Sequence, residues 1–195
     1  MTLDKTIPKK FYLNDPKEVA VKLLGKIIVR KLGEKILSGY IVETEAYYGR
    51  EDPASRARRG GQLAKMMYGD VGVALIYGVH AKWLFNIVAH KPGNAGAVLI
   101  RAIHPINGVE VMKKLRKTSR IKILTSGPGR WTQAFAIDKS LHGKPVYMPE
   151  GKIKIIEGKH TNMNEIISSH RIGVTEDLEE HLRFYIKNNP FISRK

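Results

Sequence analysis

The chain has 195 residues, which suits one compact domain (residues 1–195) with a sizeable core, and its 43% hydrophobic content is ordinary for a globular protein. It has no cysteine, no run of about eighteen apolar residues and no apolar signal core, which excludes disulfides, thiolate metal sites and a membrane-spanning helix and leads us to expect an intracellular location. Its 34 Lys and Arg residues outnumber 18 Asp and Glu residues. The net charge of +16 favours a polyanionic partner such as nucleic acid, although a lysine-rich proteome would also account for it.

The first elements along the chain are a helix and a hairpin. Residues 14–24 open with Asn-Asp-Pro and space their apolar residues as a capped helix does. Residues 26–31 and 36–44 are rich in β-branched side chains and flank the turn 32–34, so they predict two paired strands. The arginine-rich, polar stretch 50–61 is expected to be a loop.

Strands dominate the rest of the chain and come in successive runs. The expected strands are residues 72–77, 83–89, 97–103, 152–156 and 182–186, and the expected helices are residues 108–115 and 131–137. Such an order predicts the α+β class, with one curved, largely antiparallel sheet and helices outside it, and argues against alternating βαβ units.

Two glutamates lie close together in the run Glu43-Thr44-Glu45-Ala46-Tyr47. Side chains two residues apart in a strand point to the same face, so Glu43 and Glu45 would form an acidic spot near Tyr40 and Tyr47. Strands disfavour acidic residues, and a carboxylate on such a face is a candidate general base that positions a water. The plain alternative is a solvated edge strand with surface glutamates.

Tyr77 ends an apolar run and precedes a turn, so it could project as a wedge into a base stack. Alternatively, it is a core tyrosine that closes a strand. The side chains of Arg56, Arg58 and Arg59 could contact phosphate or be solvated. Arg101 interrupts the apolar run AVLIRAI, and a buried arginine needs partners, so we expect a pairing or binding role there.

The remaining motifs are weaker. No pair among the seven histidines has the spacing of a metal site such as HExxH, so no metal is expected. Residues 126–130 (SGPGR) look like a phosphate-cradling turn but lack the lysine and the spacing of a P-loop. A structural or DNA-phosphate role is therefore preferred for them.

Taken together, the motifs resemble a known family. The segments IVETEAYYGREDPAS, ALIYG, VLIRAIHPINGVEVM, TSGPGR, QAFAIDKS and LRFYIKNNPFIS follow one another as in the alkyladenine (3-methyladenine) DNA glycosylases, from about Lys9 to Ser193. The resemblance implies a monofunctional, cofactor-free enzyme, expected as a monomer in a prokaryotic cytoplasm. Such an enzyme flips an alkylated purine, hypoxanthine or ethenoadenine out of double-stranded DNA and hydrolyses its N-glycosidic bond.

The resemblance also implies roles for individual residues. Glu45 corresponds to the family's general base, and Tyr77 to the tyrosine that takes the place of the flipped base in the stack. Tyr47 corresponds to an aromatic wall of the base pocket. The substrate-binding positions are Glu43, Tyr47, Arg56, Ala74, Asn86 and Arg101, and the further DNA-binding positions are Arg58, Arg59 and His80.

The chain departs from the family pattern in the base pocket. Arg56 stands where the family usually has histidine, and Ala74 stands where an aromatic residue stacks on the base. The segment before Asn86 is about two residues longer than usual. An Arg56 guanidinium lying on the base would repel cationic purines and suit neutral ones, whereas Trp83 in that place would favour cationic purines. In the third alternative Arg56 contacts phosphate and the pocket is open.

Two rival functions remain. A non-catalytic nucleic-acid-binding domain is one, because the expected fold resembles the carboxy-terminal domain of methionyl-tRNA formyltransferases. Glu43 and Glu45 argue against it, since a binder of polyanions gains nothing from carboxylates on its binding face. The other is a bifunctional glycosylase-lyase with a lysine Schiff base, against which only the family resemblance argues.

Overall fold

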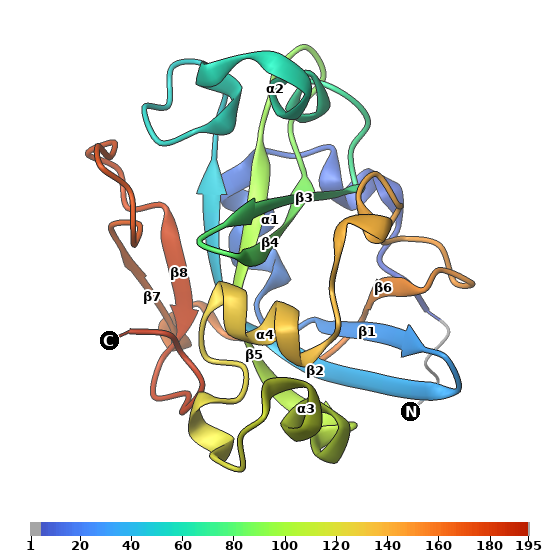
Figure 1. Cartoon of the computed structure of the whole chain (residues 1–195). Helices are drawn as coiled ribbons and strands as arrows, with labels where there is room; N and C mark the ends of the chain where they lie inside the picture. The colour runs from blue at the N-terminus through green and yellow to red at the C-terminus, as the bar shows by residue number, and fades with distance from the viewer. Residues whose placement is uncertain (1–4, 195) are drawn as a thin grey trace.

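One curved sheet of eight strands organises the fold (Figure 1). The computed structural model describes residues 5–194. The strands are β1 (Ile27–Leu32), β2 (Lys35–Tyr47), β3 (Ala74–Val79), β4 (Lys82–Val88), β5 (Ala97–Asn107), β6 (Ile153–Ile156), β7 (Ile166–Ser169) and β8 (Arg183–Ile186). They pair in the order β3-β4-β5-β2-β1-β6, with β8 joined to β2 and β7 to β8, and these pairs are antiparallel.

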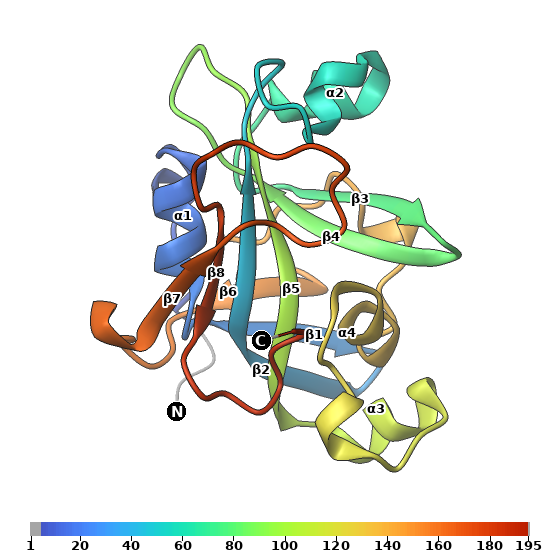
Figure 2. The same ribbon diagram turned by 90° about the vertical axis from the view of Figure 1, so that its left-hand side faces the viewer.

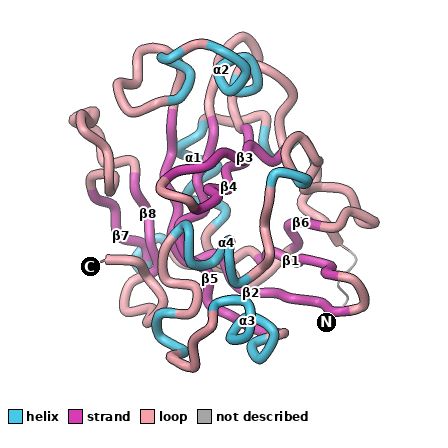
Figure 3. The backbone as a smooth tube through the Cα atoms, viewed as in Figure 1, coloured by secondary structure: helices cyan, strands magenta, loops and turns pink. Residues whose placement is uncertain are grey.

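The helices lie outside the sheet, as Figure 3 shows. They are α1 (Pro16–Leu23), α2 (Gly61–Met67), α3 (Val109–Arg116) and α4 (Pro128–Ala134). The expected α+β class, with a largely antiparallel sheet and peripheral helices, is therefore confirmed. In residues 5–194, none of the helices has the length and apolar character that crossing a bilayer requires.

Strand β2 pairs with three other strands and is central to the sheet. Its first half pairs with β1 and its second half with β8, while β5 follows its other side for most of its length. The register between β2 and β5 shifts on both sides of Glu43, and such irregularities bend a strand. Figure 2 shows β2 and β5 rising together, with the segment between β7 and β8 crossing in front of them. Residues 43–45 are consequently interior to the sheet and not on an edge.

The core fills the space between the sheet and the helices. The buried side chains of Leu23 on α1, Ile41 on β2 and Ile100 on β5 belong to one apolar cluster with Trp131 and Phe135. The Trp131 indole N–H donates to the Ile100 carbonyl (2.8 Å), so this large ring is buried without an unsatisfied donor. Each such side chain stabilises the fold by about 1.5–3 kcal/mol.

Three details differ from the sequence-based expectation. Helix α4 begins at Pro128, three residues before the expected start, because proline is well suited to the first helical position and its missing N–H is not needed there. Helix α2 was not expected, since it begins at the second of two glycines with positive φ, Gly60 and Gly61, and has no side-chain cap. Strand β7 was missed as well, because it is short, partly exposed and ends in two serines.

Candidate active site

Glu45 lies near the end of β2, where β2 has a strand on each side. It pairs with Leu99 of β5 and with Arg183 of β8, and its side chain is fully buried. Its Oε2 accepts a hydrogen bond from the Tyr47 hydroxyl (2.8 Å). Its Oε1 accepts one from the backbone N–H of Ile172 (2.8 Å). Two donors from different parts of the chain therefore orient this carboxylate.

Arg101 of β5 joins the two glutamates. Its Nε lies 3.1 Å from Glu43 Oε1, and its Nη1 lies 3.1 Å from Glu45 Oε1. Glu43 is fully buried and also accepts hydrogen bonds from Arg183 Nε (2.8 Å) and the Ser193 N–H (2.6 Å). Both carboxylates thus point to the same side of β2, as strand alternation predicts. The alternative of surface glutamates on an edge strand is wrong, and the expected pairing of a buried Arg101 is confirmed.

The surroundings of Glu45 change its acidity. Burial raises the pKa of this carboxyl above the ordinary glutamate value, while the Arg101 charge, the Ile172 N–H and the Tyr47 hydroxyl oppose the rise. Burial and the neighbouring Glu45 also raise the pKa of Tyr47, so its hydroxyl stays a protonated donor. A carboxyl shifted by burial and by a specific charged partner is a candidate for acid–base chemistry.

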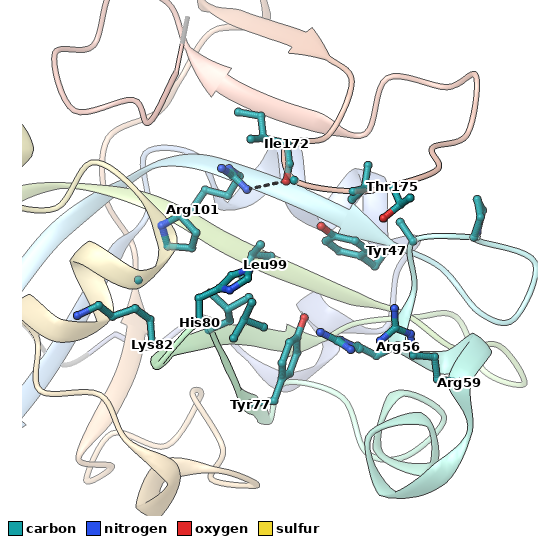
Figure 4. A pocket seen from close by; sticks show the side chains of 18 of the residues that line it. Tyr47, Arg56, Arg59, Tyr77, His80, Lys82, Leu99, Arg101, Ile172 and Thr175 are labelled. Carbon is teal, nitrogen blue, oxygen red and sulfur yellow. Dashed lines mark hydrogen bonds between the residues drawn. The ribbon is translucent and has the colours of Figure 1, made fainter.

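A cavity of about 540 Å³ opens beside Tyr47, Arg101 and Ile172 (Figure 4). Glu45 itself does not line it but contacts all three of these lining residues. The basic lining residues are Arg56, Arg59, His80, Lys82 and Arg101, and the acidic lining residue is Glu176. Such an excess of cationic side chains around one opening attracts anionic ligands.

A second, much smaller cavity of about 10 Å³ lies between Tyr47 and Tyr77. The Arg56 guanidinium carbon stands 4.8 Å from the centre of the Tyr77 ring, and both side chains line the two cavities. Asn86 lines the smaller cavity, is 2% exposed and donates from Nδ2 to the Leu75 carbonyl (3.1 Å). The space would hold about one water, so a flat ring enters only if Tyr77 or Arg56 moves.

Of the three positions considered for contact with the flipped base, 56, 74 and 83, only one lines a cavity. Ala74 is fully buried in β3 and lines neither cavity, because it points to the opposite face of the strand from Tyr77. Trp83 lies across from Gly78 on β4, is 36% exposed and lines neither cavity. Arg56 is the candidate that the structure brings to the site.

Two of the three expected DNA-binding residues lie at the larger cavity. Arg59 and His80 line the larger cavity, His80 at the turn between β3 and β4. Arg58 is exposed, lies outside the lining and has Glu176 Oε2 3.7 Å from its Nη1. Within residues 5–194, no group of three or more His, Asp or Glu side chains is arranged to hold a metal ion.

Sequence analysis missed the loop between β7 and β8. Residues 172–176 of this loop line the larger cavity, and the Ile172 N–H binds Glu45. The preceding residue, Arg171, is buried in ion pairs with Asp52 and Asp177. The sequence offers no local signal for this arrangement, because the partners Arg171 and Asp52 are 119 residues apart.

The similarity of this chain to known proteins covers nearly its whole length. The family model described as methylpurine-DNA glycosylase (MPG) matches residues 10–190. The chain belongs to this family. The resemblance inferred from the ordered motifs is therefore confirmed, and the family assigns the chain to the DNA glycosylases of base excision repair.

Individual relatives match along almost their entire chains. A protein of Aeropyrum pernix named "Putative 3-methyladenine DNA glycosylase" is 42% identical, and the match covers 98% of this chain and 95% of that one. Proteins of the same name from Chlorobium phaeobacteroides and Carboxydothermus hydrogenoformans are 42% and 39% identical. Those two matches cover 96% and 97% of this chain and 96% and 99% of the relatives.

Proposed function

We propose that this protein acts as a single-domain, monomeric and monofunctional glycosylase without a cofactor. It binds duplex DNA, turns a damaged purine out of the stack and hydrolyses its bond to the sugar, with Glu45 as the general base. The observation that carries this proposal is a fully buried carboxylate of raised pKa in contact with Tyr47, Arg101 and Ile172, which line an open cationic cavity. The cationic rim suits the phosphates on both sides of the target nucleotide.

The chemistry follows from the surroundings of Glu45. As the purine leaves, the sugar develops oxocarbenium-like positive charge, which a nearby carboxylate stabilises. Glu45 Oε2 accepts one protein hydrogen bond, from Tyr47, which leaves a lone pair to accept the proton of an attacking water. Arg101 pairs with both Glu45 and Glu43, and its charge favours the ionised form of the base against the effect of burial.

Base entry requires a rearrangement between the two tyrosines. Tyr77 partly fills the space beside Tyr47, so its movement into the DNA stack would open that space and occupy the gap left by the purine. Stacking on an aromatic ring contributes about 1–3 kcal/mol per base, which would hold the flipped purine against Tyr47. Asn86, buried at the edge of this space, would contact the edge of the base.

The substrate range is proposed from Arg56. Its guanidinium lines both cavities, so a purine beside Tyr77 would lie next to a fixed positive charge. Neutral lesions such as hypoxanthine and ethenoadenine would tolerate this charge better than the cationic 3-methyladenine and 7-methylguanine. The alternative, in which Arg56 turns to a phosphate when DNA binds, would leave cationic lesions acceptable.

A panel of duplexes that each carry one lesion tests the proposal. We expect release of an intact free purine from at least one lesion under single-turnover conditions, and no release from an undamaged duplex. Binding to every duplex without release of any base would instead favour the non-catalytic nucleic-acid-binding domain and would contradict the proposed function.

A further inference from the structure

The Arg171 side chain, fully buried, ties three separate segments of the chain together. Its Nη1 and Nη2 donate to the two carboxylate oxygens of Asp52 (2.6 and 2.7 Å), in the loop that follows β2. Its Nη1 also donates to the Ala46 carbonyl of β2 (3.0 Å). Its Nε and its backbone N–H donate to Asp177 (2.8 and 2.9 Å), at the far end of the cavity-lining loop. The two-pronged pairing with Asp52 requires the planar fork of a guanidinium.

The same guanidinium supports the ring of Tyr47. The Arg171 guanidinium carbon lies 4.6 Å from the centre of this ring, and Tyr47 lines both cavities. A cation against an aromatic face is attracted to the ring and so stabilises the ring orientation. Because the Tyr47 hydroxyl donates to Glu45, the orientation of the ring also sets the position of that donor.

The residue after Arg171 reaches Glu45 directly. The Ile172 N–H donates to Glu45 Oε1, and residues 172–176 form one wall of the larger cavity. Arg171 and Asp177 lie at the two ends of this wall in the sequence. Their ion pair therefore holds the two ends of the wall together. One guanidinium thus connects to both donors of the Glu45 carboxylate, Tyr47 through the ring and Ile172 through the backbone.

Stability alone is a poor explanation for this cluster. One guanidinium meets two carboxylates inside the protein, those of the fully buried Asp52 and of Asp177, whose side chain is 15% exposed. Burial acts to lower the pKa of Arg171, but the hydrogen bonds and charges of Asp52 and Asp177 raise it overall, so it stays cationic. Buried ion pairs are often replaceable by apolar side chains without loss of stability, so a role in orienting three segments accounts better for this guanidinium.

We propose that Arg171 is a positioning residue of the active site. It holds the wall 172–176 and the Tyr47 ring in the positions from which the Ile172 N–H and the Tyr47 hydroxyl donate to Glu45. The inference rests on the proposed function of Glu45 as the base. It assigns to Arg171 no contact with the substrate. Its effect is to keep Glu45 covered and correctly oriented while a purine occupies the cavity.

The acidity of Glu45 reports whether the wall is closed. The charged and titratable groups around this carboxyl are Glu43 and Tyr47 from β2, Arg101 from β5, Arg183 from β8 and Arg171 behind Tyr47. A loosened wall admits water to Glu45 and removes the Ile172 hydrogen bond. Burial is the larger of these two effects on its pKa, so opening the wall lowers the pKa toward the ordinary glutamate value.

Asp177→Ala tests the proposal. It removes the Arg171–Asp177 ion pair and leaves in place the Arg171–Asp52 pair and the contact of Arg171 with the Tyr47 ring. Glu180→Ala is the matched control, since Glu180 is an acidic residue of the same loop that pairs with the exposed Lys17 away from the cavity. For each variant, we would measure the Glu45 carboxyl titration by NMR, single-turnover base release, binding to undamaged duplex and the melting temperature.

We expect Asp177→Ala to lower the pKa of Glu45 and to slow base release about tenfold or more, with binding to undamaged duplex within about twofold of wild type. Glu180→Ala should leave all these quantities unchanged. If the Glu45 titration and the release rate of Asp177→Ala match wild type, even with a reduced melting temperature, the role is only structural and the proposal is wrong.

A second variant is needed because Asp177→Ala could change more than the ion pair between Arg171 and Asp177. Arg171→Lys keeps a positive charge but cannot bridge Asp52 and Asp177 at once. If both substitutions act on the same wall, their effects on the Glu45 pKa and on release are not additive in the double variant. Fully additive effects would overturn the proposal. If wild type releases no base, the proposed function fails, and the Glu45 titrations alone still decide whether Arg171 positions this carboxylate.

Discussion

At the scale of single residues, the site depends on how one carboxylate is surrounded. Burial raises the pKa of Glu45, and this rise is opposed by the ion pair with Arg101 and by the hydrogen bonds from the Tyr47 hydroxyl and the Ile172 N–H. Glu43, two residues earlier, is held by Arg101, Arg183 and Ser193, whereas Glu45 contacts Tyr47 and Ile172 of the cavity lining. We therefore expect the two glutamates to differ in role, with Glu43 anchoring Arg101 and Glu45 acting in the chemistry.

The substitution Glu45→Gln is expected to abolish base release while DNA binding is kept. The amide cannot take a proton from water, and general-base catalysis contributes about 10²–10⁴-fold to a rate. Removing a negative charge beneath a cationic cavity should not weaken binding to DNA. Single-turnover assays and a gel-shift titration measure the two quantities. Excision by Glu45→Gln within about threefold of wild type would remove Glu45 from the mechanism.

The rate of base release should depend on pH through Glu45. The ionised form is the active base, so the rate falls as pH decreases through a pKa that burial has raised above 4.5. The same shift means that this group favours folding below pH 4.5, and that the contribution is lost as pH rises through the folded-state pKa. A pH–rate profile with lesions that need no protonation checks this, and an acid limb at or below pH 4.5 would contradict it.

Arg56→His is expected to shift the substrate range toward cationic purines. The guanidinium beside Tyr77 carries a permanent charge, whereas histidine is largely neutral at pH 7.5. The ratio of 3-methyladenine release to hypoxanthine release should therefore rise by about tenfold, and Arg58→His, at an exposed position outside the cavity, is the control. An unchanged ratio would mean that Arg56 does not face the base.

At the scale of elements, the hairpin of β3 and β4 both lines the larger cavity and contains a strained turn. His80 and Ala81 connect the paired residues Val79 and Lys82, with φ angles of 46° and 57°. A two-residue hairpin turn with both central φ angles positive is type I′, which prefers Asn-Gly. The strained turn holds His80 and Lys82 at the edge of the cavity, next to the start of α4.

Ala81→Gly is expected to stabilise the protein by about 1 kcal/mol, because left-handed backbone is costly for residues with a Cβ and free for glycine. Base release should stay within about twofold of wild type, since Ala81 lines neither cavity. Urea denaturation measures the free energy of unfolding, with Ala54→Gly in the loop after β2 as a comparison that should gain nothing. A lower stability of Ala81→Gly would show that the turn does not keep this conformation.

At the scale of the whole molecule, charge and sheet topology act together. The net charge of +16 gives a general attraction to DNA that weakens as salt is added. The topology gathers basic side chains from the loop after β2, the β3–β4 hairpin and β5 around one opening. A polyanion is thus directed to the place where the buried carboxylate lies.

No covalent intermediate between protein and DNA is expected during base release. The lysine that lines the cavity, Lys82, donates to Gln133 Oε1 (3.2 Å) and lies at the rim, so a water activated by Glu45 is the better nucleophile. Borohydride should trap no adduct on the timescale of excision, and Lys82→Ala should still release the base. Efficient trapping that Lys82→Ala eliminates would instead establish the glycosylase-lyase alternative.

The sequence by itself determined the features that depend on neighbouring residues. Alternation along a strand placed Glu43 and Glu45 on one face, β-branched runs predicted most of the strands, and the ordered motifs predicted the family. The expectation for Arg101 also followed locally, because a charged residue within an apolar run must find buried partners.

Only the tertiary structure decided which of these residues meet. Glu45 is buried where β5 and β8 flank β2 and the Ile172 N–H of the β7–β8 loop reaches its carboxylate, and burial raises its pKa. The wall 172–176 and its Arg171–Asp52 pair join segments with no shared local pattern. The cavities lie on the face of β3 that carries Leu75 and Tyr77, which leaves Ala74 on the opposite face. Periodicity gives the face of a residue within its own element, whereas burial, acidity and long-range ion pairs depend on which elements pack together.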